Sequence, residues 1–278
     1  MSRCRLCGGS TQFRFTRTIL SSLECGYHEC TNCRALQTDT PTWLDRSYSA
    51  EFHGLGMESA SRSVWSQALV AYLARVLGVR GKILDFGGGV GLLCRLLRDI
   101  GYDAFLYDAY SENIYAKDFT AAPDAKYGMV TAFEVFEHFA SPLEDARLLF
   151  QGNPDFVVVG TDLYRGQGPD WYYIFPDPGQ HVFFWSAGAH RWLANQLGYH
   201  VVTVGKKITV YGRAKLGPVR TMLARGCEVG AKLTQMTLPL AGRPGLARDE
   251  QLVTKSKPAH AAGPFDTAGP SELPARSH

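Results

Sequence analysis

Short apolar segments alternate with amphipathic ones from about residue 58 to residue 215, and this alternation constrains the fold more than any other feature of the sequence. Residues 61–78 place apolar side chains at helical spacing and end at Gly78, which predicts a helix. Residues 82–86 then form a short apolar segment that predicts a strand. The same patterns predict further strands over residues 102–108, 127–134 and 155–163, helices over residues 91–101 and 187–199, and a closing hairpin over residues 200–215. The alternation predicts an α/β fold with a parallel, doubly wound sheet.

The composition excludes several classes of protein. A chain of 278 residues that is 45% hydrophobic and 12% aromatic can bury a full-sized core. No apolar run approaches the roughly 18 to 20 residues of a membrane span, and the start of the sequence lacks the apolar core of a signal peptide, so we expect a cytoplasmic protein. The formal net charge of +3 leaves no large surplus for a nucleic-acid backbone, and nucleic acid is not the expected partner.

Four of the seven cysteines form two Cys-x-x-Cys pairs, Cys4 with Cys7 and Cys30 with Cys33, and 22 residues separate the pairs. Four thiolates at this spacing predict a closed, tetrahedral and therefore structural zinc site within a module over residues 1–45. The alternatives are four unrelated buried thiols or a redox pair. Cys25 and His28 lie close enough to be substitute ligands, but their spacing fits less well. Cys94 and Cys227 stand alone and are interpreted as small apolar residues.

The loop after the first predicted strand carries glycine at every second position behind an aspartate, as Asp85-x-Gly87-x-Gly89-x-Gly91. In a parallel sheet, ligands bind beyond the carboxyl ends of the strands, where such a loop leads into a helix. A nicotinamide-binding loop would place glycine where Leu92 stands, and the Gly-Lys-Ser or Gly-Lys-Thr of a phosphate-binding loop is missing. The spacing therefore disfavours both nucleotide-binding loops.

The glycine pattern resembles the first motif of class I S-adenosylmethionine-dependent methyltransferases, which implies their Rossmann-like sheet. Asp108 lies 23 residues after Asp85, where that family places the carboxylate that accepts the ribose hydroxyls. Glu134 opens the string Glu-Val-Phe-Glu-His, which is close to a Glu-x-x-Glu-His segment common in the same enzymes. The resemblance implies S-adenosylmethionine as the cofactor and a set of residues that bind it: Asp85, Gly87, Gly89, Gly91, Asp108 and Glu134.

Over about residues 1–210, the order of the segments is similar to a subgroup of bacterial methyltransferases that carry an N-terminal zinc-binding motif and usually accompany glycosyltransferases. The resemblance implies a methyltransferase domain over residues 58–215 and a sugar, glycan or other small-molecule acceptor. Sugar C-methyltransferases of related architecture carry a large additional C-terminal domain that is missing here, which leaves O-methylation of a glycan or glycolipid open. An RNA methyltransferase with a zinc finger and an interaction protein that has lost the reaction are the alternatives.

The expected catalytic residues are His181, His138 and Glu137, in that order. An acceptor that gives up its proton reluctantly benefits from a nearby base, and histidine has the unperturbed pKa nearest neutral pH. His181 follows an aromatic segment over residues 170–180 that we expect to fold over the cofactor. His138 and Glu137 come second, since they follow the carboxylate of Glu134 directly. The alternative for His181 is a histidine that only hydrogen-bonds a loop.

The C-terminal part of the sequence loses the strand and helix alternation. A helical extension is expected over residues 216–238, weakened by Gly226 and Gly230. Residues 239–278 are rich in Pro, Gly, Ala and Ser and poor in apolar periodicity, which predicts a disordered tail. We accordingly expect that deleting the chain after about residue 240 leaves its thermal stability nearly unchanged.

Overall fold

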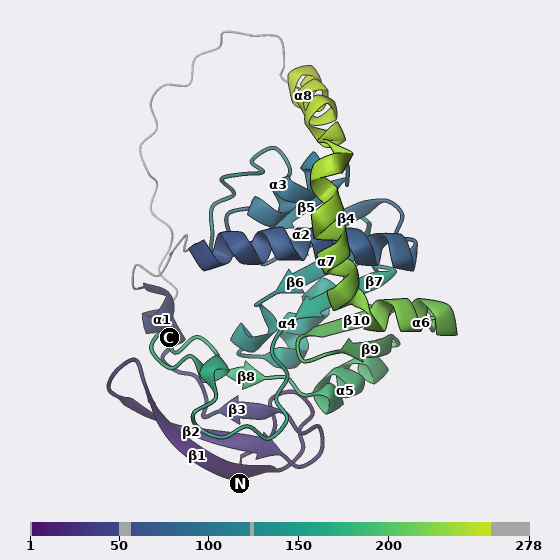
Figure 1. Ribbon diagram of the computed structural model, residues 1–278. Helices are drawn as coiled ribbons and strands as arrows, with labels where there is room; N and C mark the ends of the chain where they lie inside the picture. The colour runs from purple at the N-terminus through teal and green to yellow at the C-terminus, as the bar shows by residue number, and fades with distance from the viewer. Residues whose placement is uncertain (1, 50–56, 123–124, 257–278) are drawn as a thin grey trace, which may run out of the picture.

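The main sheet of the protein has six strands (Figure 1). The computed structural model describes residues 2–49, 57–122 and 125–256. The strands are β4 (Lys82–Phe86), β5 (Ala104–Tyr107), β6 (Tyr127–Phe133), β7 (Phe156–Gly160), β9 (His200–Val204) and β10 (Ile208–Gly212), in the order β5-β4-β6-β7-β10-β9. The first four are parallel, whereas β10 runs antiparallel to both neighbours. The sheet is therefore mixed rather than purely parallel, because β9 and β10 form the predicted closing hairpin, and a hairpin reverses the chain direction.

Helices cover both faces of the main sheet, so two hydrophobic cores form. On β7, Val157 and Val159 face one core and Val158 faces the other, as the alternation of side chains along a strand requires. The helices are α2 (Met57–Leu77), α3 (Leu92–Asp99), α4 (Pro142–Leu149) and α5 (Ala187–Leu197). Side chains of α2 and α3 fill one core and those of α4 and α5 fill the other. The doubly wound α/β arrangement is therefore confirmed.

A second, antiparallel sheet of four strands lies below the main sheet in Figure 1, and the paired cysteines lie at the end of one of its strands or in the turns beside it. It consists of β1 (Thr11–Ile19), β2 (Leu23–Cys30), β3 (Leu36–Thr38) and β8 (Phe183–Phe184), in that order, and α1 (Leu44–Ser49) follows it. The strand β8 comes from the far end of the methyltransferase segment and pairs with β3. The N-terminal sheet is thus completed by a part of the chain that the sequence assigns to the other domain.

The C-terminal region is helical up to the last described residue. Residues 218–237, where a helical extension was expected, form α6 (Pro218–Arg225) and α7 (Cys227–Thr237), followed by the short helix η3 (Leu238–Ala241). The expectation of disorder from residue 239 is wrong for residues 244–256, which form α8 (Pro244–Ser256). The rest of that predicted tail, residues 257–278, lies outside the described residues. No helix among the described residues is long and apolar enough to cross a membrane.

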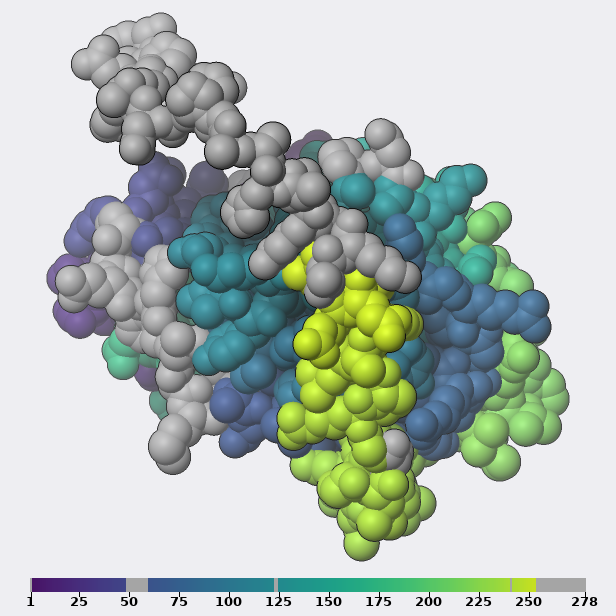
Figure 2. All heavy atoms as spheres, turned by 90° about the horizontal axis from the view of Figure 1, so that it is seen from above, coloured from purple at the N-terminus to yellow at the C-terminus, as the bar shows by residue number. Residues whose placement is uncertain are grey.

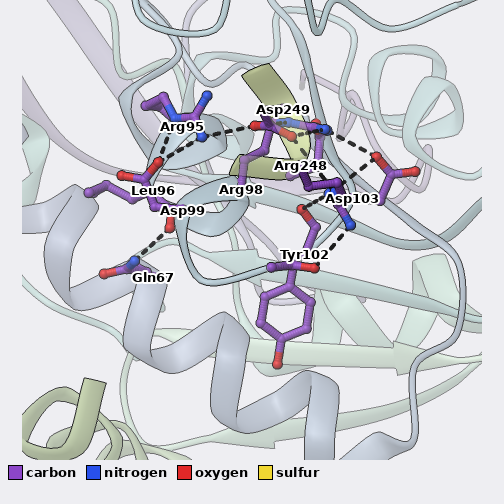
Figure 3. Close-up of polar contacts among 11 residues, drawn as sticks. Gln67, Arg95, Leu96, Arg98, Asp99, Tyr102, Asp103, Arg248 and Asp249 are labelled. Atoms are coloured by element: carbon purple, nitrogen blue, oxygen red, sulfur yellow. Dashed lines mark hydrogen bonds and ion pairs between the residues drawn. The ribbon is translucent and has the colours of Figure 1, made fainter. Parts of the chain in front are cut away.

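The helix α8, yellow in Figure 2, is held against α3 by an ion pair (Figure 3), and this explains why apolar periodicity did not reveal it. Asp249, which is 4% exposed, accepts two hydrogen bonds from the fully buried Arg98, from Nε at 2.9 Å and from Nη2 at 2.7 Å. Arg95 donates a further one to Asp249 Oδ2 at 2.9 Å. Gly245 lies so close to α3 that a side chain there would overlap the carbonyl of Arg98. A contact of this kind depends on two or three residues and leaves no periodic pattern in the sequence.

Candidate active site

The glycine loop connects the carboxyl end of β4 to α3, and its backbone conformation requires glycine. Gly87, Gly89 and Gly91 have φ of 68°, 58° and 86°, a region that side chains disfavour. A Cβ on Gly87 would lie 2.6 Å from Cγ2 of Val135, whereas a Cβ on Gly89 would meet nothing within 4 Å. At Gly89, which no other described residue approaches in this way, the loop therefore presents bare backbone at the edge of the sheet where α/β proteins bind ligands.

Asp85 lies beneath this loop, 2% exposed, and a side chain on Gly88 would overlap its carboxylate. Its Oδ1 is 3.3 Å from the hydroxyl of Thr131, and its Oδ2 has no hydrogen-bond partner among the described residues. Burial raises the pKa of Asp85 to about 7, and the charge of Asp108 adds to this. A buried carboxylate oxygen without a partner fits a ligand that carries positive charge, as S-adenosylmethionine does.

Asp108 fixes the loop from the neighbouring strand. Its Oδ2 accepts a hydrogen bond from the backbone N–H of Gly89 at 2.8 Å, and its Oδ1 accepts from the N–H groups of Tyr110 and Ser111, both at 2.8 Å. The carboxylate that the resemblance assigns to the ribose is therefore oriented by three backbone groups. The ring of Tyr110 stacks on that of Tyr48, with centroids 5.0 Å apart.

A second group of ionisable side chains follows β6. Glu134 has φ of 55°, a strained conformation for a residue with a side chain, and its Oε2 lies 3.0 Å from the hydroxyl of Tyr173. The same hydroxyl lies 2.6 Å from Oε1 of Glu137. Burial raises the pKa of both carboxyl groups, that of Glu134 to about 7 with a contribution from the charge of Glu137. Tyr173 comes from the short helix η2 (Tyr172–Ile174) and was not predicted from the sequence.

His138 and His181, the two predicted histidines, lie together with ring centroids 5.0 Å apart. Nδ1 of His181 is 2.7 Å from the carbonyl oxygen of Tyr173, and Nδ1 of His138 is 3.2 Å from that of Gln180. Since a carbonyl only accepts, both Nδ1 atoms carry the hydrogen and the lone pair is on Nε2. Burial lowers the pKa of His181 and lowers that of His138 to about 3. The unperturbed pKa of histidine, on which the choice of His181 was based, is therefore lowered in this environment.

Val135 joins the glycine loop to the group of carboxyl groups and histidines, because it follows Glu134 in the chain and contacts Gly87. The N-terminal part of the chain adds a residue that no sequence signal marked: the hydroxyl of Tyr48 is 3.4 Å from Nδ1 of His138. Trp43 contributes more remotely, because its Nε1 donates to the carbonyl of Gly179 at 2.8 Å, close to the segment of His181. The structure thus brings the glycine loop, the carboxyl groups and the histidines to one end of the sheet.

The four paired cysteines form one cluster, with ligand atoms within 4.8 Å of one another. The Sγ atoms of Cys4 and Cys33 are 3.7 Å apart and those of Cys7 and Cys30 are 3.5 Å apart, too far for a disulfide. Tetrahedral zinc with bonds of about 2.3 Å places its sulfur ligands about 3.8 Å apart, so the cluster fits zinc. Cys25 and His28 lie outside this cluster.

Comparison with known proteins agrees with this geometry. A family model described as a methyltransferase domain matches residues 57–204, which is more than half of the chain. No curated protein sequence matches. The chain therefore belongs to this methyltransferase-domain family. It is an S-adenosylmethionine-dependent methyltransferase.

Solved structures of similar fold are distant in sequence. Magnesium protoporphyrin IX methyltransferase from Synechocystis PCC 6803, with bound SAH, is 16% identical with a TM-score of 0.42, covering 62% of this chain and 93% of its own. The mitomycin 7-O-methyltransferase MmcR is 13% identical with a TM-score of 0.42, covering 62% and 60%. The small RNA methyltransferase HEN1 is 16% identical with a TM-score of 0.41, covering 55% and 26%. Membership of the family rests on the family model.

Proposed function

We propose that this methyltransferase acts on a sugar, glycan or other small-molecule acceptor whose reacting group must lose a proton. The observation that carries this proposal is the position of Val135, which joins the glycine loop at Gly87 to the group of Glu134, Glu137 and the two histidines. A cofactor on the loop would therefore lie beside side chains that accept protons. S-adenosylmethionine supplies an electrophilic methyl group when it is bound.

The cofactor-binding residues are proposed as the sequence predicts them. The backbone of Gly87, Gly89 and Gly91 lets the cofactor lie against the main chain, and Asp85 offers negative charge to a cationic ligand. Asp108 is proposed to accept the ribose hydroxyls, supported by its fixed orientation. Glu134, at the carboxyl end of β6, adds negative potential beside the loop.

The proposed base is His181. Its Nδ1–H is held by the carbonyl of Tyr173 at 2.7 Å, which leaves the Nε2 lone pair free to take a proton from the acceptor. His138 and Glu137 are the second choices, and their burial and fixed hydrogen bonds also support a role in positioning His181. Because burial lowers the pKa of His181, the base is unprotonated and ready at neutral pH, although it holds the proton weakly.

The zinc site is proposed to be structural and held by the thiolates of the cysteine cluster. Hydrogen bonds to sulfur support this role, since the backbone N–H groups of Asn32 and Cys33 both lie 3.4 Å from Sγ of Cys30. Four thiolates leave no open position for a substrate, so the metal would stabilise the N-terminal sheet.

Two variants test the cofactor site. We expect the wild type to bind S-adenosylmethionine with a dissociation constant on the order of 1 μM. Gly89→Leu places a side chain in the open space of the loop and should abolish binding in a calorimetric titration. Gly198→Leu is the matched control, because Gly198 also has a positive φ, of 72°, and open space around it, but caps α5 away from the loop. Equal binding by both variants would contradict the assignment.

A third variant tests the base. His181→Ala should retain cofactor affinity and lose about a hundredfold or more in turnover, as loss of a general base does. Turnover can be followed as transfer of a labelled methyl group to glycans and glycolipids extracted from cells that lack the protein. A variant that methylates at the normal rate from pH 6 to 9 would place the base elsewhere. Label found only in RNA would refute the proposed class of acceptor.

A further inference from the structure

One carboxylate and two imidazoles near the glycine loop are arranged as metal ligands usually are. Glu137 and His138 lie on the short helix η1 (Phe136–His138), and His181 lies just before β8. One ligand atom of each residue lies within 4.8 Å of the others. Two histidines and one carboxylate form a common ligand set for divalent transition metals, one that leaves coordination positions open for a substrate.

The two histidines are held in the form that a metal requires. Metal-binding histidines usually donate their second N–H to a carbonyl or carboxylate, which fixes the ring and leaves the other nitrogen to the ion. Here the carbonyls of Tyr173 and Gln180 accept from Nδ1 of His181 and His138. No hydrogen bond of the described residues reaches the Nε2 atoms.

Glu137 provides an independent observation. Its side chain is fully buried, its Oε1 accepts from Tyr173 at 2.6 Å, and its Oε2 has no hydrogen-bond partner among the described residues. No ion pair among those residues involves Glu137 or the adjacent Glu134. A buried carboxylate without a cationic partner is costly, and a bound cation removes that cost.

We propose that Glu137, His138 and His181 bind one divalent transition-metal ion, distinct from the zinc of the cysteine cluster. The ion holds the acceptor by an oxygen atom in an open position and lowers the pKa of that hydroxyl, as bound metals do for water. The catalytic role of the ion rests on the proposed function. Binding of the ion to the three residues does not depend on that function. An ion bound to Nε2 of His181 would occupy the lone pair that was proposed above as the base, so in the metal-loaded protein the bound hydroxyl would instead release its proton to solvent.

His181→Ala should lose turnover whether His181 acts as a base or as a metal ligand. Metal binding is therefore the measurement that distinguishes the two roles. The full-length, zinc-loaded protein is titrated with Mn²⁺ without cofactor or acceptor, and free Mn²⁺ is followed by electron paramagnetic resonance. Mn²⁺ is the probe because it prefers oxygen and nitrogen ligands over the thiolates of the cysteine cluster. We expect about one bound Mn²⁺ per chain.

Glu137→Gln and His181→Ala should each weaken Mn²⁺ binding at least about tenfold. His200→Ala, at an exposed histidine on β9, is the matched control and should bind Mn²⁺ as the wild type does. Retained binding of S-adenosylmethionine shows that each variant is folded, and Glu137→Gln keeps the shape of the side chain if His181→Ala is unstable. A wild type that binds no Mn²⁺, or variants that bind it equally well, would overturn the proposal. A protein that binds Mn²⁺ but never methylates would refute only the proposed function.

Discussion

Buried carboxyl groups have two kinds of environment in this protein, one with a cationic partner and one without such a partner among the described residues. Asp249 is paired with Arg98, and although burial raises its pKa, the hydrogen bonds and charges of Arg98 and Arg95 lower it overall. Asp85, Glu134 and Glu137 form no ion pair within the described part of the chain, and burial raises the pKa of each. The unpaired carboxyl groups all lie at the carboxyl end of the main sheet, so unbalanced negative charge is concentrated where the cationic cofactor is expected.

The pKa of Asp85 should make cofactor binding depend on pH. In the cofactor-free protein this pKa of about 7 exceeds the ordinary 3.8, so the contribution of Asp85 to stability is present below pH 4 and lost as the pH rises through 7. A positively charged cofactor favours the ionised form. Affinity should therefore rise with pH from 5.5 to 7.5, by at most about tenfold per unit, with release of a proton.

Calorimetry of S-adenosylmethionine binding in two buffers of different ionisation enthalpy measures this proton release. Asp85→Asn should bind more weakly and lose the pH dependence that Asp85 causes. The charge of Asp108, which also raises the pKa of Asp85, remains in the variant. Equal pH dependence in the variant and the wild type would assign the proton to another group.

At the scale of elements, close contacts between helices decide which glycines are needed. Gly226 separates α6 from α7, and a Cβ there would lie 3.5 Å from the nearest atom, the carbonyl oxygen of Leu223, which is ordinary contact. Gly230 lies inside α7, where glycine lowers helix stability, but its backbone packs on the ring of Tyr72 in α2 and leaves no room for a side chain. Gly226 therefore marks a boundary between two helices, whereas Gly230 is needed for the packing of α7 on α2.

The two glycines should respond in opposite directions to alanine. Gly230→Ala should destabilise the protein by about 1–3 kcal/mol, because the overlap with Tyr72 outweighs the gain in helix propensity. Gly226→Ala, the matched control, should be neutral or stabilise by up to about 1 kcal/mol. Chemical denaturation measures both. If Gly230→Ala proves as stable as Gly226→Ala, α7 does not pack on α2 as described.

The helix α8 should contribute to stability through Asp249, which corrects the expectation that the chain after about residue 240 is dispensable. Asp249→Asn should cost about 3 kcal/mol, at the low end for a broken buried pair, since Arg98 still donates to Asp103 and to the carbonyl of Ala104. This stabilisation is present above the ordinary pKa of 3.8 and is lost as the pH falls through the lowered value.

Thermal and denaturant unfolding at pH 7 measure the effect of Asp249→Asn. Asp155→Asn is the control, because it removes an exposed pair with Arg213 and should cost less than about 1 kcal/mol. A cost for Asp249→Asn no larger than that of the control would show that α8 is not held by this pair.

Whether a feature could be predicted from the sequence depends on how far apart along the chain its interacting residues lie. Strands and helices of the main sheet have local periodicity, and the glycine loop has a local spacing, so both were recognisable. Tyr173 reaches Glu137 across 36 residues and Tyr48 reaches His138 across 90, and no periodic pattern records such contacts. The lowered pKa of His181 was equally hidden, since it results from burial by segments that the sequence does not place together.

At the scale of the molecule, the two sheets are one structure. The strand β8 extends the N-terminal sheet, and the residues on either side of it belong to the proposed active site and to α5. Ser186, at the start of α5, donates from its hydroxyl to the carbonyl of Cys33, and Arg5 donates to the carbonyl of Val182. A change in the cysteine cluster is therefore expected to reach His181, which precedes Val182.

Removal of zinc should impair methyl transfer more than cofactor binding. The glycine loop belongs to the main sheet, whereas His181 lies next to a strand of the N-terminal sheet. We expect about one zinc per chain by metal analysis of protein purified without chelator. The double variant Cys4→Ser, Cys33→Ser should lose the metal and most of its turnover while still binding S-adenosylmethionine.

Cys25→Ser is the control for the metal content, because Cys25 is buried in the same sheet outside the cluster and should leave one zinc per chain. Wild-type protein without zinc, or a double variant that retains it, would disprove the metal site.

The pairing of β3 with β8 also sets an order of events during synthesis on the ribosome. Thr38 contacts Val182 across 144 residues, so at 5–20 residues per second the partner of β3 is made roughly 7 to 30 s after it. Until then the outer edge of β3 has no neighbour and is open to pairing with other chains. Cys33 is made before this interval begins, so a metal bound by the four thiolates would hold the β1–β2 hairpin together while the nascent chain waits for β8.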